Sequence, residues 1–453
     1  MLDRGLIRIA LLGALTGFMA SMLVLAFRAS IEIGQHYFLP DGKIGNYEAL
    51  PGWARLALPL GGALLLGLVF ERLPKANRGV GIVHVIDYLR FRKQSLPFRN
   101  ALVQFFGGIV AILSGHSVDR EGPGVHLGAA NAALIGRRMR LDEDEDYLLA
   151  AAGGAAAIAA AYNTPLAGVI FVIEVLRVRY AVNHIVPVIV ASVIGAVFSR
   201  LVYGHSPAFA VPPLAIGSLS ELPVIMLLGL VIGVLASAFI AGCQHTARLT
   251  MQWRPLYALL AAGLVTGVLA QWAPQIMGVS YDTLDRMLEN HVLGSTLLII
   301  LVAKLIATAV SVGARVPGGL IGPSLIIGGA VGAIAEGIAQ QWYPWYAGSN
   351  GFYTMIGMVA MMGAVLRAPL AALVALMELT GNLNIILPGM IAVVIAELAT
   401  RSLSGDVSAF TVLLAESHKA EAVTPPIEES IDQSEGEESA EKSEDEDVVK
   451  TAE

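Results

Sequence analysis

The chain has 453 residues, of which 56% are hydrophobic and only 14% charged, and its mean hydropathy is +0.69. This balance excludes an ordinary soluble globular domain and indicates an integral membrane protein. The formal net charge of −7 belongs to the end of the chain, because residues 421–453 carry 13 acidic side chains against two lysines and leave the rest slightly basic.

Long apolar runs recur along almost the whole chain. The first, residues 9–27, is about 19 residues long, close to the roughly 20 residues that cross a bilayer as a helix. It has no convincing cleavage pattern and is predicted to be a retained first helix. A transmembrane barrel would instead show short alternating segments. The sequence therefore predicts an all-α, multi-pass membrane protein.

Seven basic side chains crowd residues 71–99, around the sequence GVGIVHV at 79–85. Loops rich in Lys and Arg tend to lie on the cytoplasmic side of a membrane. We therefore expect this connecting segment to be cytoplasmic.

The chain contains an internal repeat. EGPGVHLGAA (121–130) aligns with IGPSLIIGGA (321–330) at an offset of 200, and NTPLAGVIFVIEV (163–175) aligns with RAPLAALVALMEL (367–379) at an offset of 204. Ordered Gly-Pro and Pro matches are harder to attribute to chance than matches of Leu and Ala. Transport proteins are often built from two such related halves.

The Gly and Pro residues inside these apolar stretches predict chain breaks where half-helices begin. Proline inside a helix costs about 3 kcal/mol, but it is tolerated in the first turn. Half-helices can end within a membrane only where their free backbone groups face protein or water. Because helix N-termini present unpaired N–H groups and partial positive charge, several converging N-termini would form an anion site.

The segment DREGPGVHLGA (119–129) places Asp119, Arg120 and Glu121 directly before such a break. Charged residues cost roughly 2.5–3.5 kcal/mol each in lipid, so these side chains must line a cavity or the protein interior. A carboxylate beside an anion site can occupy the site itself when no anion is bound. We therefore predict that Glu121 competes with the anion and that protonation releases it.

Together these motifs, Arg120-Glu121-Gly122-Pro123, YNTPLAGVIFVIE (162–174), PGGLIGP (317–323) and RAPLAALVALMELT (367–380), resemble the ClC family of chloride channels and proton/chloride antiporters. The resemblance extends from about residue 6 to residue 415. It implies a ClC-type inverted repeat of tilted and broken transmembrane helices, assembled as a homodimer in which each subunit has its own anion pathway.

The resemblance also assigns roles to individual positions. Glu121 matches the family's gating glutamate. The backbone amides of Leu320 and Ile321 match those that hold the central anion, and the amides around Gly122 match those near the outer site. With the positions of the segment at 79–85 and of residue 410, the predicted anion-binding residues are Val80, Gly81, Gly122, Leu320, Ile321 and Phe410.

The chain departs from the family pattern at these places. Val80 replaces the serine that usually binds the anion, Phe410 stands where many members have tyrosine, and Asp119 replaces a glycine that commonly precedes the Arg-Glu-Gly-Pro sequence. The first two changes each remove a hydroxyl donor, so we expect backbone amides to carry more of the coordination. Asp119 is expected to add a charge near the outer mouth.

One departure concerns proton coupling. Many of the family's antiporters have two adjacent glutamates, the second being the inner proton-transfer residue, where this chain reads Glu174-Val175. Valine cannot carry a proton, and the family's channels commonly have valine there. We therefore favour a passive, glutamate-gated chloride channel; a proton-coupled antiporter that lacks the usual inner glutamate stays open as the alternative. Glu174 itself is predicted to cap or bridge broken helix ends.

Other function classes find no support. The chain has no HExxH, GxSxG or P-loop motif, one cysteine (Cys243) and no Cys/His spacing suited to a metal, so no enzyme activity and no cofactor are expected, with chloride as the bound ion. Nor is there an aromatic-interleaved basic patch for nucleic acid.

The domain organisation follows from these patterns. Residues 1–420 are predicted to form the transmembrane domain, with repeat halves at roughly 30–205 and 220–415. Residues 421–453 are predicted to be a disordered, cytoplasmic acidic tail, because they have too few apolar residues to offset the entropy of ordering. The expected location is the cell membrane, the inner membrane in a bacterium.

Overall fold

The computed structural model describes residues 4–91, 95–205, 209, 219–292, 294–342 and 351–422. Over these residues, all regular secondary structure is helical apart from one isolated backbone bridge. The predicted all-α class is therefore confirmed. Most of the predicted acidic tail, residues 423–453, lies outside the described residues.

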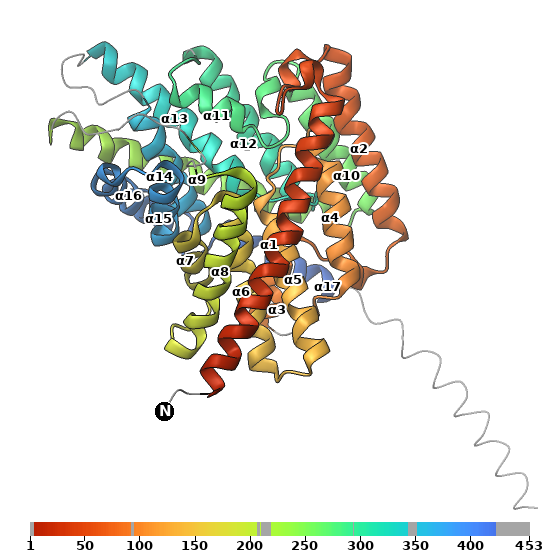
Figure 1. The fold of residues 1–453 in the computed structure, drawn as a ribbon. Coiled ribbons are helices and arrows are strands. Elements are labelled where there is room, and N and C mark those ends of the chain that lie inside the picture. Colours follow the sequence, from red (N-terminus) through yellow and green to blue (C-terminus); the bar gives the residue numbers. More distant parts are fainter. Residues whose placement is uncertain are drawn as a thin grey trace, which may run out of the picture.

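Figure 1 shows how the helices pack around one another. The α-helices are α1 (Arg4–Phe38), α2 (Gly52–Arg72), α3 (Gly81–Phe91), α4 (Phe98–Leu113), α5 (Glu121–Met139), α6 (Glu143–Tyr162), α7 (Pro165–Glu174), α8 (Val182–Tyr203), α9 (Leu222–Thr250), α10 (Pro255–Leu269), α11 (Tyr281–Leu288), α12 (Gly294–Gly313), α13 (Ile321–Trp342), α14 (Phe352–Leu366), α15 (Pro369–Thr380), α16 (Ile386–Ser404) and α17 (Ala409–Ala422). The short 3-10 helices are η1 (Pro40–Gly42), η2 (Tyr47–Ala49), η3 (Lys75–Asn77), η4 (Leu219–Glu221), η5 (Pro274–Ile276) and η6 (Leu383–Ile385).

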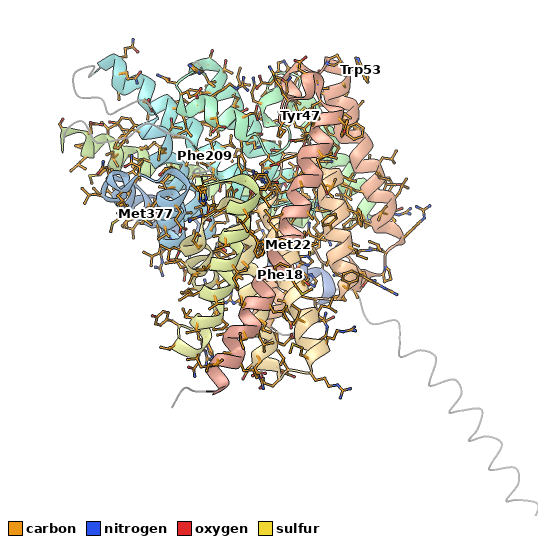
Figure 2. The ribbon with its side chains drawn as sticks, in the orientation of Figure 1. Phe18, Met22, Tyr47, Trp53, Phe209 and Met377 are labelled. Atoms are coloured by element: carbon orange, nitrogen blue, oxygen red, sulfur yellow. The ribbon has the colours of Figure 1, made fainter. Side chains whose placement is uncertain are left out.

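Seven helical stretches of the described chain are long and apolar enough to cross a membrane. Large apolar side chains cover their outward faces: Phe18 and Met22 on α1 are 43% and 36% exposed and lie on the outer side of the molecule in Figure 2. Trp53, which is 75% exposed, lies near one end of the molecule, where an aromatic ring suits the boundary between lipid and water. These features make the chain a multi-pass membrane protein.

Helix α1 is longer than the apolar run that predicts it. It has 35 residues and crosses in front of α4, α5 and α6 in Figure 1. At 1.5 Å per residue it extends about 52 Å. The helix continues past the apolar run because its polar end is paired inside the protein: Arg28 Nε lies 2.6 Å from Glu32 Oε1, and Glu32 also pairs with Arg120 at 3.2 Å.

The two halves of the predicted repeat adopt matching local structures. Helices α5 and α13 begin at the two Gly-Pro motifs, and α7 and α15 begin at Pro165 and Pro369. The preceding helices α6 and α14 each end in a left-handed residue, Asn163 (φ 60°) and Arg367 (φ 59°). The predicted helix breaks are therefore real, and they occur in pairs.

Reciprocal glycine contacts hold the central helix pairs together. A Cβ atom on Gly128 of α5 would lie 2.3 Å from the carbonyl oxygen of Gly153 on α6, and one on Gly153 would lie 2.2 Å from that of Gly128. Gly328 of α13 and Gly357 of α14 repeat this arrangement, with both distances at 2.2 Å. Because any side chain would clash, these glycines allow the two backbones in each half to touch.

Candidate functional site

The N-termini of α5 and α13 meet at the centre of the protein. The segments before them join through the backbone bridge between Asp119 and Gly319, in which the Asp119 N–H donates to the Gly319 carbonyl at 3.2 Å. Asp119 and Gly319 are equivalent positions at the repeat offset of 200. The related half-helices therefore direct their free N–H groups toward one region, as an anion site requires.

A cavity of ≈ 180 Å³ reaches this region. Its lining includes five of the six predicted anion-binding residues, which come from four separate parts of the chain: Val80, Gly81, Gly122, Leu320 and Phe410. Phe410 is only 3% exposed, at the start of α17. The sixth, Ile321, is the first residue of α13; it is buried and lines a second, smaller cavity.

Basic side chains line the same cavity. Lys75 and Arg78 come from the connection after α2, and Arg315 comes from the segment after α12. Two acidic lining residues have partners: Glu416 lies 2.9 Å from Arg248, and Asp87 Oδ1 lies 2.7 Å from His418 Nε2. The positive charges would raise the local concentration of anions at the cavity.

One predicted anion donor already has a protein partner. The Gly81 N–H donates to Gln104 Oε1 at 2.6 Å, and the backbone at Gly81 has φ 72°, a conformation that favours glycine. Val80, immediately before it, offers no hydroxyl. The Gly81 amide is therefore occupied by the protein, and Val80 adds no side-chain donor to this wall.

Glu121 is buried, with 1% of its surface exposed, at the first position of α5. Its Oε1 accepts a hydrogen bond from the Tyr281 hydroxyl at 2.9 Å, and Oε2 accepts from the Arg120 backbone N–H at 3.2 Å. The Tyr281 hydroxyl is also hydrogen-bonded to that of Tyr162. The Arg120 guanidinium forms ion pairs with Glu32 (3.2 Å) and with Glu121 Oε1 (3.6 Å). The gate candidate is therefore held by a chain of two tyrosine hydroxyls from distant helices.

Asp119 lies deeper than its sequence position suggests. It is fully buried, and its two carboxylate oxygens accept hydrogen bonds from the N–H groups of Gly122 (2.9 Å) and Gly322 (3.0 Å). These amides belong to the first turns of α5 and α13. The carboxylate therefore bridges the two helix N-termini.

Glu174 and Val175 lie at the end of α7. Both Glu174 oxygens accept hydrogen bonds from the first turn of α15, from Leu370 N (3.2 Å) and Ala371 N (2.7 Å). Val175 is buried and apolar. The Glu174 carboxylate therefore acts as a helix cap, as the sequence suggested.

A pair of histidines lies beside the cavity. His84 of α3 lines it, and His84 Nδ1 lies 2.9 Å from Nε2 of His126 on α5; the rings stack with centroids 5.1 Å apart. Both side chains are buried. The pair joins α5 to a residue that lies 42 positions earlier in the chain.

Three further functional candidates were not identified from the sequence. Tyr281 and Tyr162 hold Glu121, and nothing in their local sequence connects them to residue 121. Lys304 is fully buried in α12 and donates to Ile276 O (3.0 Å), Gly278 O (3.1 Å) and Ser280 Oγ (2.8 Å). A lysine inside an apolar run was the signal that could have found it. By holding residues 276–280, Lys304 positions Tyr281.

No group of three or more His, Cys, Asp or Glu side chains suited to a metal ion occurs among the described residues.

Comparisons with known proteins agree with this geometry. The sequence profile described as voltage gated chloride channel matches residues 62–401. The H(+)/Cl(-) exchange transporter ClcA of Vibrio parahaemolyticus is 30% identical over 410 residues, covering 87% of this chain and 86% of that protein. The voltage-gated ClC-type chloride channel ClcB of Salmonella typhimurium is 28% identical over 408 residues, covering 87% of this chain and 96% of that protein.

The solved structure of a slow cyanobacterial Cl−/H+ antiporter matches with a TM-score of 0.79 at 21% identity, covering 93% of this chain and 99% of that one. This likeness shows the fold, including the predicted inverted repeat of broken helices. From the profile match and the extent of the sequence similarity, the chain belongs to the ClC family of chloride channels and proton/chloride antiporters.

Proposed function

We propose that this protein conducts chloride passively across the membrane and that Glu121 gates the pathway. The main support for a passive mechanism is the structural role of Glu174. Both of its carboxylate oxygens cap α15, and its neighbour Val175 has no titratable group. Because Glu174 caps the fixed first turn of α15, we assign it a structural role and not a role in moving protons along the pathway. The inner part of the pathway therefore lacks a carboxylate free to load protons at this position.

The proposed pathway begins at the cavity lined by Lys75, Arg78 and Arg315, which attracts the anion. Chloride then passes Phe410 and reaches the amides at the start of α13, including those of Leu320 and Ile321. Beyond them, the Glu121 carboxylate blocks the way by charge and by volume. Protonation of Glu121 removes its charge, which weakens its bond with Tyr281 and the Arg120 amide and lets the side chain leave.

A second candidate function is supported by the His84–His126 pair. These imidazoles connect the cavity lining to α5, on which His126 lies five residues after Glu121, about 7.5 Å along the helix axis. An imidazole can donate a proton from one ring nitrogen and accept one at the other, so two adjacent rings form a chain along which a proton can pass. In a proton-coupled antiporter, this pair would supply the inner proton path that Val175 cannot.

Simultaneous recording of chloride efflux and external pH separates the two functions. Proteoliposomes would hold a chloride gradient with no imposed proton gradient. Passive conduction predicts chloride flux without proton movement, and Glu121→Gln should increase that flux at neutral pH. Proton movement driven by chloride, lost in His84→Ala or His126→Ala, would establish the antiporter. No chloride flux from correctly assembled protein would overturn both.

The assembly and orientation are part of the same proposal. We place the protein in the cell membrane as a homodimer, with the basic cavity and the C-terminal tail on the cytoplasmic side, on the basis of the family resemblance and of the seven basic residues in 71–99. Mass measurement of the purified protein in lipid nanodiscs tests the dimer. Accessibility of a cysteine introduced at Lys75 to a membrane-impermeant thiol reagent tests the orientation.

A further inference from the structure

Asp119 occupies the amides that would otherwise be available to an anion. One carboxylate oxygen takes the N–H of Gly122 and the other takes the N–H of Gly322, on helices from opposite halves of the protein. Glu121, by contrast, is bonded to the Arg120 amide and to Tyr281. The two carboxylates therefore accept hydrogen bonds from different donors, at the place where the N-termini of α5 and α13 meet.

Chloride and the Asp119 carboxylate cannot use these two amides at the same time. Each N–H donates along one direction, and an ionised carboxylate forms a strong, charge-assisted bond there. The side chain of aspartate is short, and its backbone is fixed by the bond from Asp119 N to Gly319 O. An anion can reach the Gly122 and Gly322 amides only after this carboxylate has lost its charge or turned away.

The surroundings are built to accept the carboxylate. A Cβ atom on Gly319 would lie 2.2 Å from Asp119 Oδ1, so the absence of a side chain at Gly319 makes room for it. A simple helix cap in this protein looks different: Glu174 places both oxygens on consecutive amides of one helix. Asp119 instead bridges the equivalent amides of two helices, at the point where the pathway would pass between them.

We propose that Asp119 is a second gating carboxylate, which holds the outer anion-binding amides so that chloride enters there only when both Asp119 and Glu121 are displaced or neutralised. This inference rests on the proposed chloride conduction and deepens it. It makes the gate a pair of carboxylates in series. The second carboxylate is a departure of this chain, because aspartate replaces the glycine that commonly precedes the Arg-Glu-Gly-Pro sequence.

Several charged and titratable groups surround Asp119. Glu121 faces it from the start of α5, Tyr281 from α11 and Lys304 from α12, while Arg120 and Tyr162 of α6 interact with Glu121. Glu121 is a like charge, so neutralising either carboxylate favours ionisation of the other, and acid must protonate both to free the amides. Chloride flux should therefore rise with acidity more steeply than a one-proton titration, with a limiting slope of two protons at high pH, where both carboxylates are ionised.

The first test measures chloride binding by titration calorimetry, using full-length protein purified in detergent in a chloride-free buffer near pH 7.5. In Asp119→Asn and Asp119→Gly the dissociation constant for chloride should fall by about tenfold or more, because the competing carboxylate no longer reduces the fraction of protein able to bind. Glu336→Gln is the matched control: it neutralises another buried carboxylate on α13, which accepts from Gly351 N at 2.7 Å, and should bind chloride within twofold of the natural protein.

The second test follows chloride flux from liposomes as a function of pH. Glu121→Gln should keep a one-proton activation by acid, and Asp119→Asn/Glu121→Gln should lose it. Chloride binding by both Asp119 variants that stays within twofold of the natural protein, or becomes weaker, would reduce Asp119 to a helix cap and overturn the inference. Calorimetry needs no conduction, so this result is distinct from an absence of chloride flux in the natural protein, which would overturn the proposed function instead.

Discussion

Glu174 and Glu378 cap each other's helices. Glu378, on α15, accepts hydrogen bonds from Leu166 N (3.0 Å) and Ala167 N (2.8 Å) in the first turn of α7, while Glu174, at the end of α7, does the same for α15. The exchange joins the two halves of the repeat at equivalent positions. It also explains why two glutamates are retained within apolar helices, since the amides of a broken helix end need acceptors that lipid cannot supply.

Because both glutamates are caps, their neutral variants should behave alike. Glu174→Gln and Glu378→Gln each replace one acceptor oxygen by a donor facing an N–H, which should cost about 1–3 kcal/mol of stability. The measurement is the thermal unfolding midpoint in detergent, together with the pH dependence of chloride flux. Glu289→Gln, whose side chain is 61% exposed, is the control. A Glu174 variant of unchanged stability and altered pH dependence would contradict the cap assignment.

Removing the Tyr281 hydroxyl should ease the release of Glu121. Tyr281→Phe keeps the ring, which packs edge-on against Phe209 at a centroid distance of 5.9 Å, and deletes the donor to Glu121. Figure 2 places Phe209 in the interior of the protein. A hydrogen bond to a charged group contributes about 1.5–3 kcal/mol, so chloride flux at neutral pH should rise by roughly tenfold to a hundredfold. Tyr257→Phe, on the exposed face of α10, should leave flux unchanged; equal flux in both variants would show that Tyr281 does not restrain the gate.

Restoring hydroxyl groups to the cavity should strengthen anion binding. Phe410→Tyr and Val80→Ser each add one donor to the lining, and a hydrogen bond contributes about 0.5–1.5 kcal/mol, so the dissociation constant for chloride should fall by about twofold to tenfold. Calorimetric titration with chloride tests this result. Phe106→Tyr, exposed on α4, is the matched addition of a hydroxyl outside the cavity. If all three variants bind chloride equally, then the amides alone determine affinity.

The ionisation of Asp282, on the short helix α11, should make the stability of the protein depend on pH. Burial raises the pKa of this carboxyl, Arg286 lowers it and Glu48 raises it, and the net result is a rise from 3.8 to about 6. The folded state therefore holds the proton more tightly than the unfolded state, and this contribution to stability is lost as pH rises from about 4 to about 6. Asp282→Asn should therefore gain in unfolding midpoint over the natural protein near pH 7.5, and this gain should be smaller near pH 4. A difference independent of pH would show that Asp282 does not titrate in this range.

The sequence was sufficient for the architecture because helix breaks are local. Pro165 and Pro369 begin helices for a reason that lies in their own chemistry, and the two Gly-Pro motifs identify the half-helices α5 and α13. The length of α1 was underestimated, because the ion pair between Arg28 and Glu32 stabilises its polar end only in the folded protein.

The partners within the site could not be predicted, because they come from remote parts of the chain. Tyr281 reaches Glu121 across 160 positions, and Gln104 takes the Gly81 amide from another helix. Asp119 was read as a charge near the mouth of the pathway, whereas its carboxylate is buried between two helix ends. Only the folded backbone determines which amides a short side chain can reach.

The glycine contacts between helices restrict how a gate made of the Asp119 and Glu121 carboxylates can operate. Gly128 with Gly153, and Gly328 with Gly357, bring α5 against α6 and α13 against α14 at backbone distance in both halves. Sliding either helix by one residue would drive a side chain into a carbonyl group, so the frame that carries the amides resists shear. The proposed gate therefore opens by rotation of individual side chains inside a stationary scaffold. Rotations of this kind are intrinsically faster than the rocking of whole domains, which takes microseconds to milliseconds.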